Sequence, residues 1–97
     1  MVEFKDFMDF VDTIIEPMII KNNGRILKYW LNKDANVYEN YIEVNVNGIQ
    51  LFINDDEKEI SVVEHFPASG SVTEILLMKN CSFDDYYNVI KTIYRIK

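Results

Sequence analysis

The chain has 97 residues, of which 48% are hydrophobic and 27% are charged, and these values indicate one globular domain over residues 1–97 rather than a disordered or fibrous protein. Sixteen acidic residues against ten basic ones give a formal net charge of −6, so direct binding to nucleic acid is not expected, because that depends on Lys and Arg side chains that neutralise phosphates. No apolar run approaches the roughly 18 residues needed to cross a bilayer, so we expect no membrane partner.

The first predicted element is a helix from about residue 2 to residue 15 or 16, because apolar residues recur there at helical spacing. Pro17 lacks an N–H group and disfavours an unbroken continuation. Residues 18 and 19 still match the apolar side, so the sequence leaves open a clean stop or a kinked extra turn before the turn-forming residues 21–24.

A sheet is predicted next, beginning with a strand over residues 25–32. Residues 42–46 and 49–53 alternate between apolar and polar side chains, and the Asn47-Gly48 pair between them is typical of a two-residue hairpin turn. That loop length predicts a register with the apolar side chains on one face, in which Val46 faces Ile49, Val44 faces Leu51 and Ile42 faces Ile53.

The second half of the chain predicts two more strands and a helix. Residues 55–58 form a turn, residues 59–66 a strand and residues 67–71 a break. We interpret residues 72–79 as a strand rather than a helix, because eight residues is short for a helix. A C-terminal helix should begin at Phe83, preceded by a capping box of Ser82 and Asp85.

The predicted fold class is therefore α+β, a two-layer arrangement of an N-terminal helix, an antiparallel meander of four to five strands and a C-terminal helix (αβββββα). Both helices should cover one face of the sheet. The predicted core consists of Phe4, Phe7, Val11, Ile14, Ile42, Val44, Val46, Leu51, Ile53, Ile90 and Ile93.

Enzyme chemistry finds little support in the sequence. Cys81 lies just before the predicted helix N-terminus, where a thiol pKa can fall. However, the only histidine, His65, is expected on the outward register of its strand with no orienting partner. Residues 54–57 do not match a calcium loop, and one His with one Cys cannot complete a zinc site. We therefore predict no catalytic residues, no metal and no cofactor, and the single cysteine indicates a reducing, cytoplasmic setting.

Most of the net charge lies on the first helix. Residues 1–16 hold five acids and one base, net −4, whereas residues 17–97 hold eleven acids and nine bases, net −2. We predict an acidic partner-binding surface that consists of Glu3, Asp6, Asp9, Asp12 and Glu16 together with Asp55, Asp56, Glu57 and Glu59. The plain alternative is that these acids only solvate the surface.

Such a surface predicts a non-enzymatic module that binds a protein with a basic surface, for example the nucleic-acid groove of another protein. Ile, Asn, Lys and Tyr, whose codons are rich in A and T, are abundant, and this favours a phage or mobile-element inhibitor as one form of the module.

A second hypothesis rests on the outward sheet face, where Tyr29, Tyr41 and Phe52 are expected. Aromatic side chains among polar ones are typical of interfaces, so this face would serve to form a homodimer or to hold a small apolar ligand. The alternative is that residues 32–41 fold over these aromatics.

Overall fold

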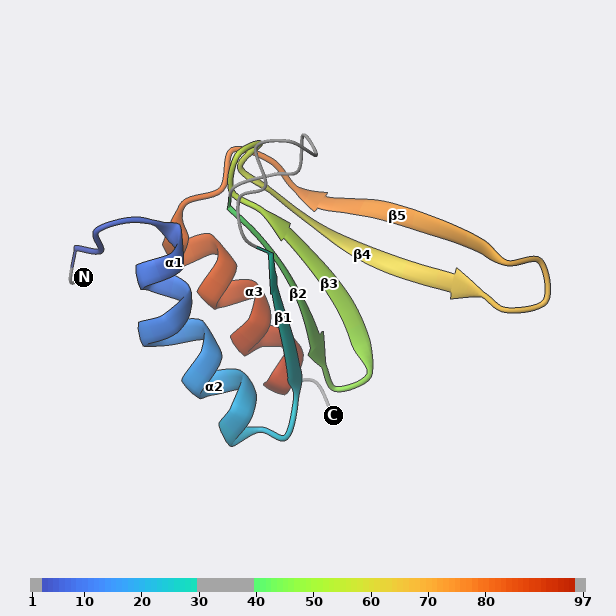
Figure 1. Ribbon diagram of the computed structural model, residues 1–97, viewed down its shortest axis with the longest axis horizontal. Coiled ribbons are helices and arrows are strands. Elements are labelled where there is room, and N and C mark those ends of the chain that lie inside the picture. Colours follow the sequence, from blue (N-terminus) through green and yellow to red (C-terminus); the bar gives the residue numbers. More distant parts are fainter. Residues whose placement is uncertain (1–2, 30–39, 96–97) are drawn as a thin grey trace.

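The computed structural model describes residues 3–29 and 40–95. The elements in chain order are α1 (Phe7–Phe10), η1 (Val11–Ile15), α2 (Glu16–Lys21), β1 (Arg25–Tyr29), β2 (Tyr41–Val46), β3 (Ile49–Asn54), β4 (Glu59–Phe66), β5 (Ser71–Met78) and α3 (Phe83–Arg95). The predicted two-layer α+β fold is confirmed, because five antiparallel strands form one open sheet in the order β1-β2-β3-β4-β5 and the helices lie on one side of it (Figure 1). No helix in the described ranges is long and apolar enough to cross a membrane.

The N-terminal helix begins later than the sequence predicted. Asp6 has an extended backbone, with φ −160°, and its side chain accepts a hydrogen bond from the N–H of Asp9 at 2.8 Å. The Asp9 carboxylate in turn accepts from the N–H of Lys5 at 2.9 Å. The first bond caps the helix at Asp6, and the second ties the preceding residue to the first helical turn, so the predicted start near residue 2 was wrong and the helix starts at Phe7. Glu3 lies before the helix.

The helix continues past Pro17 through a π-helical turn, which decides between the two alternatives left open. The N–H of Glu16 donates to the carbonyl of Val11, five residues back, which defines η1. Pro17 follows directly in α2, and because the backbone of Ile15 and Glu16 is helical, the proline lies inside one continuous helix and not at a free N-terminus. The N–H of Gly24 donates to the carbonyl of Ile19 at 2.9 Å and closes the segment.

The central hairpin has the predicted register. Val46 faces Ile49, Val44 faces Leu51 and Ile42 faces Ile53. Asn47 and Gly48 have φ of 52° and 83°, the positive values that such a turn needs. The strand over residues 72–79 is also confirmed, as β5, while residues 30–32 of the first predicted strand lie outside the described residues.

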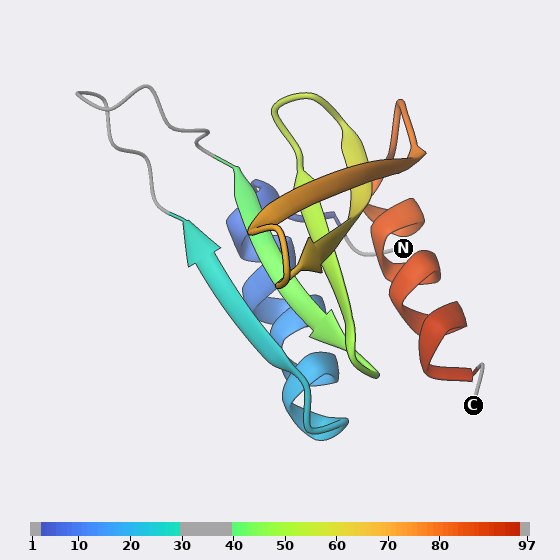
Figure 2. The same cartoon turned by 90° about the vertical axis from the view of Figure 1, so that its right-hand side faces the viewer.

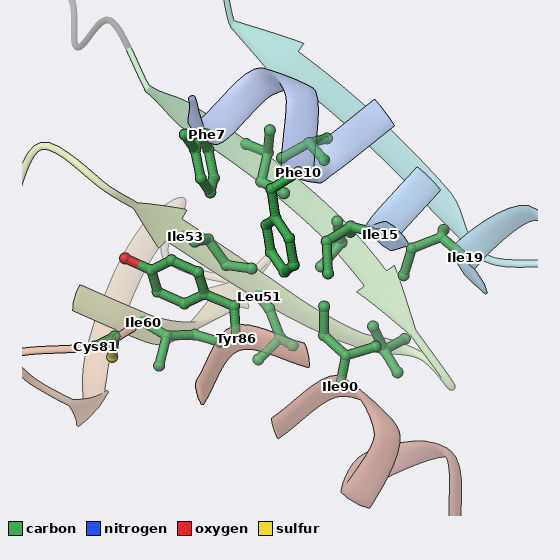
Figure 3. Close-up of a cluster of buried hydrophobic side chains, with 14 residues drawn as sticks. Phe7, Phe10, Ile15, Ile19, Leu51, Ile53, Ile60, Cys81, Tyr86 and Ile90 are labelled. Atoms are coloured by element: carbon green, nitrogen blue, oxygen red, sulfur yellow. The ribbon is translucent and has the colours of Figure 1, made fainter. Parts of the chain in front are cut away.

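The buried side chains fill the space between the sheet and the helices (Figure 3). The predicted residues Phe7, Val11, Ile42, Val44, Val46, Leu51, Ile53 and Ile90 are buried, whereas Phe4, Ile14 and Ile93 are only partly buried. Sequence reasoning missed Phe10, Ile15, Ile19, Ile60 and Tyr86, all with 0% exposure. The π turn explains part of this difference, because an extra residue per turn rotates the helix and directs Ile15 and Ile19 to the sheet in place of Ile14.

Strands β4 and β5 extend beyond the rest of the sheet. β3 pairs with β4 only as far as Val63, so residues 64–66 of β4 pair with β5 alone. This two-stranded segment, residues 64–73, is called the arm, and it projects away from the helices in Figure 1 and toward the viewer in Figure 2. A hollow of about 470 Å³ opens where β4 leaves β3, and the exposed His65 lies on its rim.

Candidate protein-binding surface

The acidic side of the first helix is mostly engaged in contacts within the chain. Asp6 and Asp9 form the helix cap. Asp12 Oδ1 lies 2.6 Å from Lys28 Nζ, and Glu16 pairs with the same ammonium group. Hydrogen bonds to Asp12 and Glu16 raise the pKa of Lys28. The structure therefore assigns these four acids to holding the helix and fastening it to β1, and leaves Glu3 exposed before the helix.

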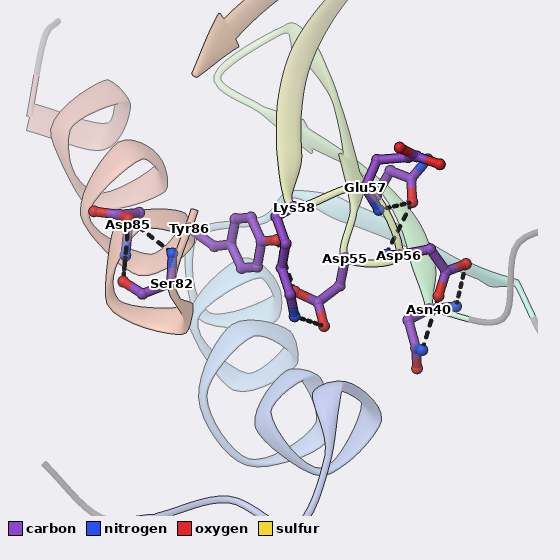
Figure 4. A network of polar contacts seen from close by, with 9 residues as sticks. Asn40, Asp55, Asp56, Glu57, Lys58, Ser82, Asp85 and Tyr86 are labelled. Carbon is purple, nitrogen blue, oxygen red and sulfur yellow. Dashed lines mark hydrogen bonds and ion pairs between the residues drawn. The ribbon is translucent and has the colours of Figure 1, made fainter. Parts of the chain in front are cut away.

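Asp55 does not belong to an exposed surface, which corrects its predicted place there. Its side chain is buried, with 7% exposure, and Oδ1 accepts a hydrogen bond from the Tyr86 hydroxyl at 2.7 Å (Figure 4). Oδ2 accepts from Lys58 Nζ at 3.1 Å. Burial, followed by the hydrogen bond to Asp55, raises the pKa of Tyr86. The carboxylate therefore fastens the β3–β4 turn to α3.

The other acids of this turn are more accessible. The Asn54 side-chain oxygen accepts from the N–H groups of Asp56 and Glu57, at 3.1 and 3.2 Å, and thereby shapes the turn. Asn40 donates its side-chain amide to Asp56 Oδ1 at 3.0 Å. Asp56 and Glu57 are exposed, and Glu59 is half-buried.

Acidic side chains gather instead at one hollow on the sheet face away from the helices. Glu57, Glu59 and Glu74 line it together with Phe52, Asn54 and Ser61, and its volume is about 290 Å³. Phe52 and Ser61 face each other across β3 and β4, and Ser61 is only 2% exposed. We call these six residues the acidic hollow. It brings together two of the predicted acids, one predicted aromatic and Glu74, which sequence reasoning did not single out.

The predicted aromatic interface is only partly present. Tyr41 is buried, with its ring centroid 3.8 Å from that of Phe52, and its hydroxyl donates to Glu43 at 2.9 Å. Tyr29 pairs with Tyr41 through the backbone. The alternative that residues 32–41 fold over these aromatic side chains concerns positions that lie mostly outside the described residues. Phe52 lines the acidic hollow and so contributes to the candidate surface.

The most exposed apolar surface lies on β5, which the sequence analysis did not identify as a site. All eight residues of Ser71–Met78 are exposed. Large hydrophobic side chains with 38–59% exposure extend along β5 and the adjoining end of β4, namely Phe66, Val72, Ile75, Leu76, Leu77 and Met78. The unbroken apolar run from Ile75 to Met78 could have indicated a binding site, because such a run is typical of a strand that is covered on both faces. Here the strand lies at the sheet edge.

Nucleophile chemistry receives no support from the environment of Cys81. The residue is buried, with 5% exposure, and its N–H donates to the carbonyl of Lys58 at 2.9 Å. Burial raises the pKa of its thiol, and the negative charges of Asp85, Asp55 and Glu59 raise it further. This is the reverse of what activates a cysteine. Within residues 3–29 and 40–95, no three His, Cys, Asp or Glu side chains group as metal ligands.

Comparisons with protein-family models, with curated proteins and with solved structures found no match to this chain.

Proposed function

We propose that this chain is a non-enzymatic protein-binding module whose binding surface is β5 together with the neighbouring acidic hollow. One observation carries the proposal, namely that every residue of the edge strand β5 is exposed although five of its eight side chains are large and apolar. Apolar patches of this kind typically mark interaction sites in folded proteins. An edge strand of eight residues with a single charge, Glu74, is also an aggregation hazard unless a partner covers it.

The charge of the surface indicates what kind of protein binds there. The chain carries −6 overall, and three glutamates converge on the acidic hollow beside β5. A partner with a basic surface would be attracted at long range and would bind faster at low salt. A module that covers such a surface would also block it, so the role of a phage or mobile-element inhibitor remains within this proposal.

The proposal departs from the sequence-based hypothesis in its location. The acidic side of α1, η1 and α2 has its carboxylates in caps and ion pairs, so charge reversal there would damage the fold before it tested binding. Glu57 and Glu74 are exposed and have no such structural role among the described contacts. They are the better positions for a test.

The experiment is affinity capture from a lysate of the source organism at low and high salt, with paired variants. We expect Ile75→Asp on β5 to lower capture of the partner by about tenfold, the loss of roughly one well-buried apolar contact. The matched control is Ile20→Asp, because Ile20 is 61% exposed and lies on α2, on the opposite side of the molecule from β5 (Figure 1). Equal capture by wild type and both variants would refute a binding role for β5.

Charge is tested in the same assay. Glu74→Lys should weaken capture, most strongly at low salt, whereas Glu3→Lys makes the same change of charge before the helix and should have little effect. If the two variants weaken capture equally, overall charge rather than the acidic hollow attracts the partner. That result would remove the hollow from the proposed surface.

A further inference from the structure

We infer that the partner is bound by strand addition, in which an extended segment of the partner pairs with the free edge of β5 and places a Lys or Arg beside Glu74. This inference rests on the proposed function and specifies how that surface binds. It draws on three features, which are the position of β5 in the sheet, its side chains, and the charge next to it.

The first feature is the free edge. Among the described residues, 3–29 and 40–95, β5 pairs with β4 on one side only, because it ends the sheet order β1-β2-β3-β4-β5. The backbone N–H and C=O groups on its other edge are therefore available to a further strand. When a strand is added, the backbone groups of both strands form hydrogen bonds with each other. No deep pocket is needed, so this mode of binding suits an open surface such as β5.

The second feature is that β5 lacks the devices that protect the opposite edge of the sheet. β1 has charged side chains at Arg25 and Lys28, and Lys28 is tied to the first helical segment. β5 contains no Lys, Arg or Pro, and Glu74 is its only charge. Charged and proline residues are the usual means of preventing edge-to-edge pairing. Their scarcity on β5 indicates an edge that accepts a strand.

The side chains of β5 show what an added strand would meet on each face. Val72, Glu74 and Leu76 pair with His65, Val63 and Ser61, so they lie on the same face as the acidic hollow. Ile75 lies on the other face, opposite Val62, and is 45% exposed. An added strand with apolar side chains beside Val72, Leu76 and Ile75 would cover this surface on both faces.

The third feature, charge, selects the occupant. The residue of the added strand beside Glu74 lies on the face of the acidic hollow, where Glu59 and Glu57 add to the negative potential. A Lys or Arg there forms a cross-strand ion pair, whereas an acidic residue is repelled. A second copy of this chain would bring its own Glu74 to the same edge, and its net charge of −6 would repel the first copy. Charge complementarity therefore favours a cationic and apolar segment of another protein over self-pairing.

The test uses short capped peptides of valine and threonine with a single central residue, either Lys or Glu, and measures binding to the full chain by fluorescence anisotropy. We expect the Lys peptide to bind about tenfold more tightly than the Glu peptide, the effect of exchanging an attractive for a repulsive neighbour of Glu74. In the Glu74→Lys variant the preference should reverse.

Backbone pairing is tested separately with two N-methylated forms of the Lys peptide, methylated at alternate residues so that one or the other edge loses its N–H groups. Strand addition predicts that one form loses binding and the other retains it, because only one edge of the peptide faces β5. Binding that tolerates both forms would show docking by side chains alone and would overturn the inference.

The remaining outcomes also decide the question. One outcome is that no peptide binds, that light scattering shows a dimer, and that Ile75→Asp dissociates this dimer. In that case β5 pairs with a second copy of the chain and the inference is wrong. If no peptide binds and the chain is a monomer, strand addition is likewise refuted. Capture of a partner that still depends on Ile75 would in that case leave the proposed function standing.

Discussion

The Tyr86 hydroxyl on α3 lies 2.7 Å from Oδ1 of Asp55, in the turn between β3 and β4. Both side chains are buried, Tyr86 with 0% and Asp55 with 7% exposure. Lys58 approaches the second oxygen of the same carboxylate. This contact joins residues 31 positions apart in the chain and fixes how α3 is placed against the end of the sheet.

Loss of this hydrogen bond should destabilise the protein measurably. Tyr86→Phe keeps the ring but leaves the buried Asp55 oxygen without its donor, so we expect the free energy of unfolding to fall by about 1–3 kcal/mol. Urea denaturation followed by circular dichroism measures this change. Tyr87→Phe is the matched control, since that half-buried tyrosine makes the same chemical change on the next position of α3. A Tyr86→Phe variant as stable as wild type would contradict the assigned role.

Stability should also decline at alkaline pH, and Tyr86 should account for part of the decline. Its pKa is raised by burial and by the hydrogen bond to Asp55, so the folded state holds the phenol proton more tightly than the unfolded state does. The resulting stability is complete below pH ~10, where the unfolded tyrosine is protonated, and is lost as the pH rises above that value. The raised pKa values of Tyr94, Cys81 and Lys28 act in the same direction.

The measurement is the urea midpoint between pH 8 and pH 11. We expect it to fall steadily above about pH 9 to 10, where the unfolded thiol and phenol groups ionise, and to fall less steeply in Tyr86→Phe. Equal slopes for the two proteins would mean that Tyr86 has the same pKa in both states.

Two glycines should be intolerant of alanine for different reasons. A Cβ at Gly24 would lie 2.5 Å from the Asn45 carbonyl oxygen and 2.9 Å from both Ile19 Cγ2 and the Tyr94 hydroxyl. We expect Gly24→Ala to lower the unfolding free energy by about 1–3 kcal/mol through overpacking. Gly48 has open space around it but a φ of 83°, so Gly48→Ala should cost about 1–2 kcal/mol through backbone conformation.

Urea denaturation of the two glycine variants separates these causes. Gly48→Asn should recover much of the loss in the turn, because Asn adopts positive φ more readily than Ala, whereas Gly24→Asn should be worse than Gly24→Ala. If Gly24→Asn were more stable than Gly24→Ala, this would argue against the close approach of β2 to Gly24.

The cap at Asp6 gives a prediction that separates the observed helix start from the one expected from sequence. Asp6→Ala removes the acceptor for the Asp9 N–H, so we expect a loss of about 1 kcal/mol in unfolding free energy. Glu3→Ala removes the same charge from an exposed position before the helix and should be nearly neutral. If the helix began near residue 2, Glu3→Ala would destabilise the protein more than Asp6→Ala. Thermal denaturation of both variants measures the two losses of stability.

Lys28 should stabilise the attachment of the first helical segment to β1. Lys28→Met keeps the length of the side chain but removes the ammonium shared by Asp12 and Glu16. Because Asp12 is 55% exposed, the loss should be about 1 kcal/mol or less and should shrink in high salt. Urea midpoints in low and high salt for both proteins give the comparison. A loss that is independent of salt would point to packing of the Lys28 stem instead.

Local patterns sufficed to predict much of the fold. The alternation around Asn47-Gly48 determined a hairpin with the observed register, and Ser82 with Asp85 forms the expected cap, with the Asp85 carboxylate 2.7 Å from the Ser82 nitrogen. Both features depend on residues close together in sequence.

Features that depend on tertiary contacts were beyond such patterns. Asp55 stands in a run of acids that resembles a solvated turn, and its burial is decided by Tyr86, which comes much later in the chain. The π turn is not predictable from apolar spacing, because its hydrogen bonds depart from the regular helical period of about 3.6 residues. The exposure of β5 follows from its position at the sheet edge, which the apolar run itself does not reveal.

The two helical segments meet through the rings of Phe10 and Phe83, which stack with centroids 4.8 Å apart and an interplanar angle of 8°. Between them in the chain lie all five strands, each paired with its immediate neighbour in sequence. During synthesis on the ribosome the meander can therefore form step by step against the N-terminal helical segment, but the part of its apolar face that α3 covers stays exposed until α3 emerges. Until then the nascent chain exposes β5 and part of the future core at the same time, a combination that favours aggregation.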